Sequence, residues 1–292
     1  MSDSKYTISD LEALSGIKAH TIRIWEKRYN IINPSRTDTN IRYYSNDDLK
    51  LLLNISFLNK NNFKISKIAE MSAKEIADNV NSINIVKSDN SDYIDNLIVA
   101  MIDLNEIFFE KIFSSTLFRL GFEKTIIEII FPFLQRTGLM WQTGSINPAQ
   151  EHFITNLIRQ KLIVAMDSLP RNTNEKSPRA LLFLPENELH ENSLLFYNYI
   201  LRNKGYHTYY FGQTVPLTDV TRIIEITNAG LIISVITTDI TQKEFDALIS
   251  ELERLPRKVK ILLSGRVVLN SQNKLAKRLT IFNDAQQLKT LI

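Results

Sequence analysis

The segment KAHTIRIWEKRY, at residues 18–29, decides how the first part of the chain is interpreted. With about 100° between successive residues, a helix over this segment has one apolar side, which consists of Ile22, Trp25 and Tyr29. Its opposite side carries His20, Arg23 and Lys27. We expect the apolar side to pack against the domain, which leaves the basic side exposed to meet phosphates.

The residues just before this helix predict another helix and a tight turn. Ser9 and Glu12 have the spacing of a capping box, which predicts a helix that begins at Asp10. Ser15 and Gly16 then supply the turn. Two helices joined by a glycine turn, the second with an exposed basic side, make up the helix-turn-helix, whose second helix enters the major groove of DNA.

The residues after this helix predict a β-hairpin. Apolar runs at 31–32 and 41–44 flank a turn at 38–40, and Arg36 and Arg42 lie at the edges of the hairpin. An asparagine, Asn40, occupies the end of the turn and tolerates positive φ better than most residues do. The sequence therefore predicts a helix-turn-helix followed by a basic wing.

The composition of the 292 residues is typical of a globular protein of two or three domains, with 44% hydrophobic and 23% charged residues. The net charge of +3 does not by itself indicate a nucleic-acid partner, but residues 16–44 hold six basic and two acidic side chains. The absence of cysteine excludes disulfides, thiolate catalysis and cysteine-ligated metals. Because we find neither a membrane-spanning run nor a signal peptide, we expect a cytoplasmic protein.

Changes of pattern along the chain predict how the domains are divided. Residues 1–75 are expected to form the DNA-binding domain, and the polar stretch at 76–92 a linker. Residues 93–170 show helical periodicity without a strand signal, which predicts a bundle of about four helices. Breaks between these helices are expected near Gly121, near Pro132 and at 144–148.

A second polar linker, bracketed by Pro170 and Pro178, leads into a last domain at 178–292. Short apolar runs expected to be strands lie at 180–184, 208–211, 231–235 and 259–263. Amphipathic stretches expected to be helices lie at 189–203, 217–228 and 242–255. This alternation predicts a doubly wound, Rossmann-like parallel sheet, so the expected fold class is multidomain α and α/β.

Five short motifs fall within about the first 70 residues, at 6–8 (YTI), 15–17 (SGI), 21–29 (TIRIWEKRY), 34–36 (PSR) and 42–44 (RYY). Together they resemble the winged helix-turn-helix DNA-binding domain of the MerR family of regulators. The resemblance implies contact with DNA by Thr21, Arg23, Arg36, Arg42 and Tyr43. The basic side of the recognition helix adds Lys18, His20 and Lys27 to the predicted DNA-binding residues.

Histidines are few, and His190 has the most informative position among the four. It follows the first strand of the α/β domain, at the carboxyl end, where open parallel sheets bind their ligands. Glu188 is placed to hold the far ring nitrogen of His190 and to fix its tautomer, as carboxylates do for metal-bound imidazoles. His20 lies in the expected DNA-binding helix and His207 begins an expected strand, and for both a structural role is favoured over metal binding.

The α/β domain carries four segments in a characteristic order: 188–193 (ELHENS), 210–212 (YFG), 234–236 (SVI) and 264–265 (SG). They resemble the cobalamin-binding fold, whose pattern is Asp/Glu-x-His-x-x-Gly, then Ser-x-Leu, then Gly-Gly. Upstream, Trp141 is followed after nine residues by Glu151 and His152, which resembles the helical cap of the cobalamin-dependent, light-sensing MerR regulators of carotenoid genes.

This second resemblance implies that His190 ligates cobalt from below, while the nucleotide tail of the corrin threads into the α/β domain. It implies that Trp141 crowds the upper ligand and that Glu151 and His152 face the upper side of the corrin. The full predicted cofactor set is Trp141, Glu151, His152, Glu188, His190, Ser193, Gly212, Ser234, Ile236, Ser264 and Gly265. Ser193 and Ser264 depart from the pattern because they stand where it has glycine, which permits close backbone approach.

These patterns leave several functions to compare. The first is a DNA-binding regulator that senses cobalamin, expected as adenosylcobalamin, with a possible light response. It would act as a homodimer or higher homo-oligomer on double-stranded operator DNA. The second is a regulator whose α/β domain binds another ligand or only mediates oligomerisation. An enzyme is not expected, because nothing in the sequence supplies a catalytic domain.

Overall fold

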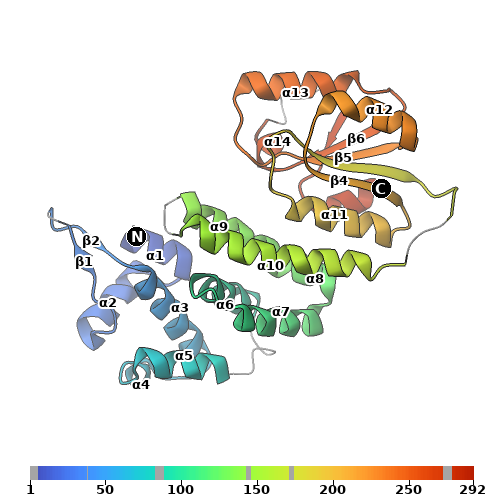
Figure 1. The fold of residues 1–292 in the computed structure, drawn as a ribbon. Coiled ribbons are helices and arrows are strands. Elements are labelled where there is room, and N and C mark those ends of the chain that lie inside the picture. The colour runs from blue at the N-terminus through green and yellow to red at the C-terminus, as the bar shows by residue number, and fades with distance from the viewer. Residues whose placement is uncertain (1–5, 38, 83–88, 143–145, 171–173, 272–277) are drawn as a thin grey trace. The chain divides into compact units, whose positions relative to one another are not determined.

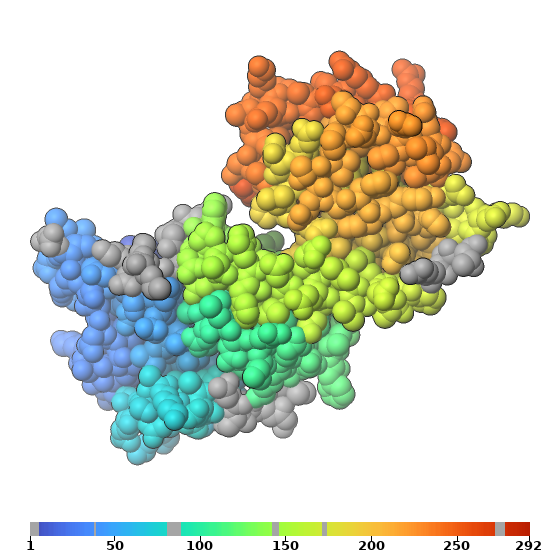
Figure 2. Space-filling view, viewed as in Figure 1, coloured from blue at the N-terminus to red at the C-terminus, as the bar shows by residue number. Residues whose placement is uncertain are grey.

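The computed structural model of the chain describes residues 6–37, 39–82, 89–142, 146–170, 174–271 and 278–292 (Figure 1). The chain divides into two compact units, Met1–Leu157 and Ile158–Ile292. Figure 2 shows the surfaces of the same elements in the same colours. Among the described residues, no helix is long and apolar enough to cross a membrane.

The first unit begins with a winged helix-turn-helix, as predicted. Its elements are α1 (Ile8–Ser15), α2 (Ala19–Tyr29), β1 (Ser35–Arg36), β2 (Arg42–Tyr43), α3 (Asn46–Lys60), α4 (Ile65–Ile68) and α5 (Ala73–Ser82). In the antiparallel wing, Arg36 lies opposite Arg42, and Asn40 has the predicted positive φ, of 65°. Asp38, in the same predicted turn, lies outside the described residues.

The predicted start of the first helix at Asp10 is wrong, because α1 is capped by Thr7. The Asp10 amide donates to Thr7 Oγ1 at 3.2 Å, and the Thr7 amide donates to Asp10 Oδ2 at 2.7 Å. This is a reciprocal capping box in which aspartate takes the place of the usual glutamate or glutamine. Thr7 therefore satisfies the first amides of α1, and the helix begins two residues earlier than the Ser9–Glu12 pattern indicated.

Helix α5 covers the first part of the polar stretch 76–92, which the sequence predicted to be a linker. Ile76 and Val80 are buried one helical turn apart, and they give this mostly polar segment a narrow apolar side. That side is the reason the segment folds, since α5 contacts α3. Residues 83–88 lie outside the described residues, and the next helix begins at Asn90.

The predicted helical bundle follows, with α6 (Asn90–Ile102), α7 (Glu106–Leu120), α8 (Phe122–Thr125), η2 (Ile126–Ile130), α9 (Phe131–Gln142) and α10 (Pro148–Asp167). Gly121 ends α7 as expected, but the predicted break near Pro132 is wrong. The chain runs from α8 through the π-helical turn η2 into α9 without leaving helical geometry. A π-turn shifts the hydrogen bonds just before proline, which lacks an amide proton and clashes with a regular preceding turn.

Two ion pairs join the bundle to the DNA-binding domain within the first unit. Lys50 Nζ on α3 lies 2.8 Å from Asp103 Oδ1, and Lys60 Nζ lies 2.7 Å from Asp92 Oδ1 on α6. Helices α3 and α6 also contact each other directly. The helix that follows the wing is therefore fixed at both ends to the first helix of the bundle.

The second unit begins within α10 and continues into a five-stranded sheet. Its strands are β3 (Arg179–Pro185), β4 (His207–Val215), β5 (Leu231–Val235), β6 (Lys260–Ser264) and β7 (Leu279–Ile281), in the order β4-β3-β5-β6-β7 with every neighbouring pair parallel. Its helices are α11 (Asn192–Asn203), α12 (Leu217–Thr227), α13 (Gln242–Arg254), α14 (Arg266–Asn270) and α15 (Ala285–Leu291). The predicted α/β fold is confirmed.

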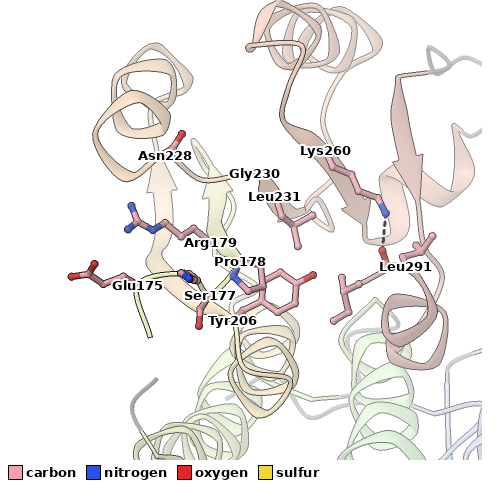
Figure 3. A pocket seen from close by; sticks show the side chains of 12 residues that line it. Glu175, Ser177, Pro178, Arg179, Tyr206, Asn228, Gly230, Leu231, Lys260 and Leu291 are labelled. Carbon is pink, nitrogen blue, oxygen red and sulfur yellow. Dashed lines mark hydrogen bonds between the residues drawn. The ribbon is translucent and has the colours of Figure 1, made fainter. Parts of the chain in front are cut away.

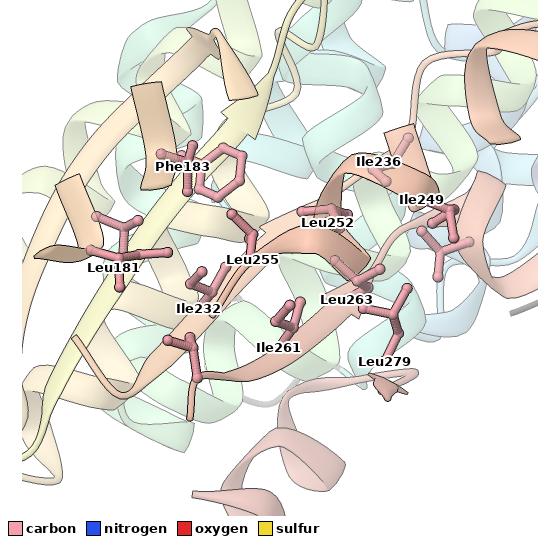
Figure 4. Close-up of a cluster of buried hydrophobic side chains, with 14 of the residues drawn as sticks. Leu181, Phe183, Ile232, Ile236, Ile249, Leu252, Leu255, Ile261, Leu263 and Leu279 are labelled. Carbon is pink, nitrogen blue, oxygen red and sulfur yellow. The ribbon is translucent and has the colours of Figure 1, made fainter. Parts of the chain in front are cut away.

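Apolar residues of the strands and of two crossover helices make the core of this unit (Figure 4). Ile232 and Ile261 on the sheet and Phe245 and Ile249 on α13 belong to it. Their burial stabilises each crossover helix against the sheet, at roughly 25 cal/mol per Å² of apolar surface. The packed sheet holds the loops after its strands in fixed positions, among them the loop that carries His190.

Candidate DNA-binding surface and cofactor site

Helix α2 has the two sides that the sequence predicted. Ile22 is fully buried and Trp25 and Tyr29 are half-buried, whereas His20, Arg23 and Lys27 are exposed. The C-terminus of α2 is closed by Asn30, whose φ of 53° is left-handed. A cationic helix face therefore lies at the surface with an apolar backing beneath it.

Glu26 joins this helix to the wing, a role that the sequence analysis missed. The hydroxyl of the buried Tyr44 donates to Glu26 Oε1, and Arg42 Nε lies 3.9 Å from Glu26 Oε2. Burial and the Glu26 carboxylate raise the pKa of Tyr44, so the phenol stays protonated as a donor. Position 26 lies one helical turn after Ile22, on the apolar side of the helix, but the helical pattern does not say which residue a glutamate there meets, so only the folded chain reveals this contact.

Glu12 performs a different task from the predicted one, because it caps α2. Its Oε2 accepts a hydrogen bond from the Ala19 amide at 3.0 Å, and its Oε1 lies 3.1 Å from Lys18 Nζ. The backbone bond and the bond from Lys18 lower the pKa of Glu12. One carboxylate of α1 thus orients the start of the recognition helix.

The remaining predicted DNA-binding residues lie on α2 and on the wing. Thr21 is half-buried, and its Oγ1 lies 3.3 Å from His20 Nε2. Arg36 is exposed and its Nη1 donates to Asn40 Oδ1 at 2.7 Å, which braces the wing turn. Tyr43 is half-buried on β2.

In the second unit, His190 and Glu188 make the contact that their spacing predicts. His190 Nδ1 lies 2.6 Å from Glu188 Oε1, and the backbone amide of His190 donates to the same oxygen at 2.9 Å. The Glu188 side chain is 2% exposed, while that of His190 is 59% exposed. In the neutral tautomer with its proton on Nδ1, the lone pair lies on Nε2, the nitrogen that a metal would take.

Glu188 is held in turn by the loop that follows β5. Its Oε2 accepts the amides of Thr237 at 2.5 Å and Thr238 at 2.7 Å, and the Thr238 hydroxyl donates to Oε1 at 3.0 Å. Burial alone would raise the pKa of Glu188, but the hydrogen bonds from His190, Thr238 and Thr237 outweigh it and lower the pKa to about 2. The carboxylate therefore stays ionised and fixes the ring of His190.

Glu191, the neighbour of His190, is also buried and doubly bound. Its Oε2 lies 2.7 Å from Arg159 Nε on α10, and its Oε1 accepts the hydroxyl of Tyr210 on β4 at 2.8 Å. A Cβ atom at Gly212 would lie 3.1 Å from Glu191 Oε1, so the glycine makes room for this carboxylate. The loop of His190 is thus anchored to the sheet by Glu188 and to α10 and β4 by Glu191.

The other predicted cofactor residues of the α/β unit lie in its interior. Ser234, Ile236 and Ser264 are all buried, and Ser193 is half-buried on α11. Gly265 has φ of 103°, and a Cβ atom there would lie 2.4 Å from the backbone oxygen of Ile236. The ends of β5 and β6 are therefore packed backbone to backbone.

The predicted upper-side residues belong to the first unit. Trp141, near the end of α9, is 56% exposed. On the first turn of α10, His152 Nδ1 lies 2.7 Å from Glu151 Oε2, and the His152 side chain is exposed. These side chains are accessible at the surface of the helical bundle.

A hollow of about 570 Å³ lies at the other edge of the sheet, where the strands begin (Figure 3). Pro178, Tyr206 and Gly230 line it. Two of its three cationic side chains are used by the fold, since Lys260 Nζ donates to the Leu291 carbonyl at 2.7 Å and Arg179 Nη1 to the Thr227 carbonyl at 3.0 Å. It lies at the edge opposite to His190, and it does not extend the predicted site.

The residues present fit a corrinoid in one respect and not in another. A half-exposed imidazole with Nδ1 held by a buried carboxylate suits a cobalt ligand. In the interior of the α/β unit, where the nucleotide tail was expected, Tyr197 and Ser264 are both buried. The residues therefore suit a cobalt ligand at His190 better than they suit a buried tail.

Two family models match the chain. The model described as MerR HTH family regulatory protein matches residues 6–75. The model described as B12 binding domain matches residues 93–165, which cover the helical bundle and not the sheet. The two matches thus fall on the winged helix-turn-helix and on the helices that follow it.

Curated relatives and one solved structure extend these matches. The HTH-type transcriptional repressor CarH of Myxococcus xanthus is 24% identical over 280 residues, with 93% of this chain and 92% of the relative covered. The repressor CarA of the same organism is 24% identical over 212 residues, with 72% and 68% covered. The monomethylamine corrinoid protein of Methanosarcina barkeri superposes with a TM-score of 0.57 at 18% identity, covering 70% of this chain and 98% of that one.

The solved structure shows the fold that the sheet and the preceding helices share with a corrinoid protein. Both of these curated relatives are transcriptional repressors, and the model that matches residues 6–75 describes a regulatory protein. Its helix-turn-helix implies DNA binding. The chain is a MerR-type helix-turn-helix transcriptional regulator with a B12-binding domain, and it resembles CarH over nearly its whole length.

Proposed function

We propose that the chain binds operator DNA through α2 and the wing, as a homodimer or a higher homo-oligomer. Exposed Arg23 and Lys27 on α2, with Arg36 and Arg42 on the wing, support phosphate contacts that supply most of the affinity. Glu26 supports this proposal because it fixes the wing to the recognition helix. A two-fold dimer would require a palindromic operator.

We propose further that the regulator senses cobalamin in the adenosyl form, with His190 as the lower cobalt ligand. The observation that carries this proposal is the 2.6 Å contact between Glu188 and His190 at the carboxyl edge of the sheet. Trp141, Glu151 and His152 are proposed to face the upper side of the corrin. When bound, the cofactor would supply a cobalt–carbon bond that light can break.

The absorption spectrum tests the cofactor. Purified protein is loaded with adenosylcobalamin in the dark without oxygen, and free cofactor is removed. We expect a corrinoid band to remain with the wild type, and His190→Ala to weaken binding by at least about tenfold. His207→Ala is the matched control, because His207 is exposed at the other edge of the sheet and packs on Tyr209. A colourless wild type would defeat the cofactor proposal.

A gel shift on the DNA upstream of the gene tests the response. Protein loaded in the dark is compared with the same sample after illumination, because breaking the bond would favour a state with a different DNA affinity. Equal affinity in the dark and the light would remove the light response and leave DNA binding intact.

A second candidate function is favoured by the filled interior between Tyr197 and Ser264. In it, the α/β unit binds a different ligand or only mediates oligomerisation. Calorimetry with a panel of metabolites, together with mass measurements at several protein concentrations, separates these outcomes from cobalamin sensing.

A further inference from the structure

In the interior of the α/β unit, three buried side chains come from α11, from the end of β6 and from the residue that follows β7. Tyr197, on α11, is 5% exposed, and Ser264, at the end of β6, is 3% exposed. The ring of Phe282, which follows β7, lies edge-on to Tyr197 with the ring centroids 5.0 Å apart. Phe282 is fully buried. The interior at this point is packed with protein.

Helix α11, which begins two residues after His190, carries the tyrosine of this cluster. Ser193 and Tyr197 are four residues apart on α11, so they share one face of the helix. Ser193 is half-buried and Tyr197 is buried, which makes Tyr197 the inner residue of the two. A group that moved inward along this face past Ser193 would meet the buried Tyr197 ring.

The wall on the far side of the cluster is held in place by backbone contacts. The Ile236 amide donates to the Ser264 carbonyl at 2.9 Å, and the Val267 amide donates to the Ile236 carbonyl at 3.2 Å. The Cβ of an alanine at Gly265 would already lie 2.4 Å from the Ile236 oxygen. The strand ends therefore have little freedom to separate and make room beside Tyr197.

The chemistry of cobalamin makes this packing significant. Its nucleotide tail carries a benzimidazole base that ligates the lower side of cobalt in the free cofactor. An imidazole that takes this position displaces the base, and the tail then needs either a space inside the protein or a place in solvent. Tyr197, Ser264 and Phe282 occupy the interior space.

We propose that this regulator recognises the corrin ring and its cobalt through His190 and leaves the nucleotide tail in solvent, so that it binds corrinoids without a tail as well as complete cobalamin. The proposal rests on cobalamin sensing by His190. It assigns Tyr197 and Ser264 a new role, as the residues that set which corrinoids the protein accepts.

The experiment compares two ligands on the full chain, hydroxocobalamin and the tail-less diaquacobinamide, titrated in the dark and followed by absorption. For the wild type we expect cobinamide to bind at least as tightly as hydroxocobalamin, because His190 must displace the base of hydroxocobalamin from cobalt and the released tail gains no buried contacts in return. Proton NMR of bound hydroxocobalamin should show narrow benzimidazole signals, as expected for a base that moves freely in solvent.

The double variant Tyr197→Val, Ser264→Gly opens the space. We expect it to bind hydroxocobalamin about tenfold more tightly than the wild type does and to leave cobinamide binding unchanged. The matched control is Tyr206→Val, at the opposite edge of the sheet, which should alter neither constant. If the double variant does not fold, the comparison of hydroxocobalamin with cobinamide on the wild type still tests whether the tail stays in solvent.

The outcomes separate the two proposals. If neither corrinoid binds the wild type, cobalamin sensing fails. If hydroxocobalamin binds and cobinamide binds more than about tenfold more weakly, with broadened benzimidazole signals, cobalamin sensing stands and the solvent-exposed tail is refuted. His190→Ala should weaken cobinamide binding most, because hydroxocobalamin can keep its own base on cobalt, and unchanged cobinamide binding would also contradict the inference.

Discussion

Arg159 Nε on α10 lies 2.7 Å from Glu191 Oε2, so an ion pair joins this long helix to the residue that follows His190. Both partners belong to the second unit. Helix α10 begins in the bundle, where it carries Glu151 and His152, and its later turns reach Arg159. A change at His190 therefore has a direct route to α10 through Glu191.

Removing this ion pair should destabilise the second unit. Arg159→Gln leaves Glu191 buried with Tyr210 as its remaining partner, which should lower the free energy of unfolding by about 1–2 kcal/mol in urea denaturation. Gln160, the exposed residue next to Arg159, provides the control. Gln160→Ala should change the free energy of unfolding by less than about 0.5 kcal/mol. Equal effects of the two variants would show that the pair contributes no stability.

Acid should weaken the second unit through Glu188. Its pKa is about 2 in the folded chain against an ordinary value of 4.5, so its contribution is complete above pH 4.5 and is lost as the pH falls toward 2. Between these limits the wild type should lose on the order of 2–3 kcal/mol more unfolding free energy than Glu188→Gln does. The exposed Glu186→Gln should behave as the wild type, and an unchanged acid profile in Glu188→Gln would contradict the assignment.

DNA affinity should depend on salt through the basic face of α2. Arg23→Ala should weaken binding to operator and unrelated DNA alike, and it should reduce the slope of log affinity against log salt by about 1. Arg222→Ala removes an exposed arginine from α12 in the second unit and should leave the slope unchanged. Fluorescence anisotropy at several salt concentrations measures the slope for both variants. An unaltered slope in Arg23→Ala would show that Arg23 does not contact a phosphate.

Gly265 should tolerate no side chain. Its φ of 103° and the 2.4 Å approach of a new Cβ to Ile236 predict that Gly265→Ala lowers the unfolding free energy by about 2–4 kcal/mol. Gly230 is the matched control, because a Cβ there meets nothing within 4 Å, and Gly230→Ala should cost less than about 1 kcal/mol. Thermal unfolding followed by circular dichroism compares the two, and similar midpoints would show that the strand ends can move apart.

Local patterns predicted some elements closely and missed others for identifiable reasons. The α2 pattern predicted its burial because Ile22 and the basic residues repeat with the helical period. Strand β7, only three residues long, and helix α14 are too short to show a period. Thr7 was missed as the N-cap because aspartate, and not glutamate, completes its capping box.

The sequence by itself determined the helix-turn-helix, the parallel sheet and the Glu188–His190 contact, because each depends on residues close together in the chain or on a regular period. Only the tertiary structure decided that Glu26 binds the wing tyrosine Tyr44, that Arg159 holds Glu191, and that Tyr197 fills the interior beside Ser264. These partners lie 18, 32 and 67 residues apart in the chain, and no local pattern encodes which side chains meet when distant segments pack.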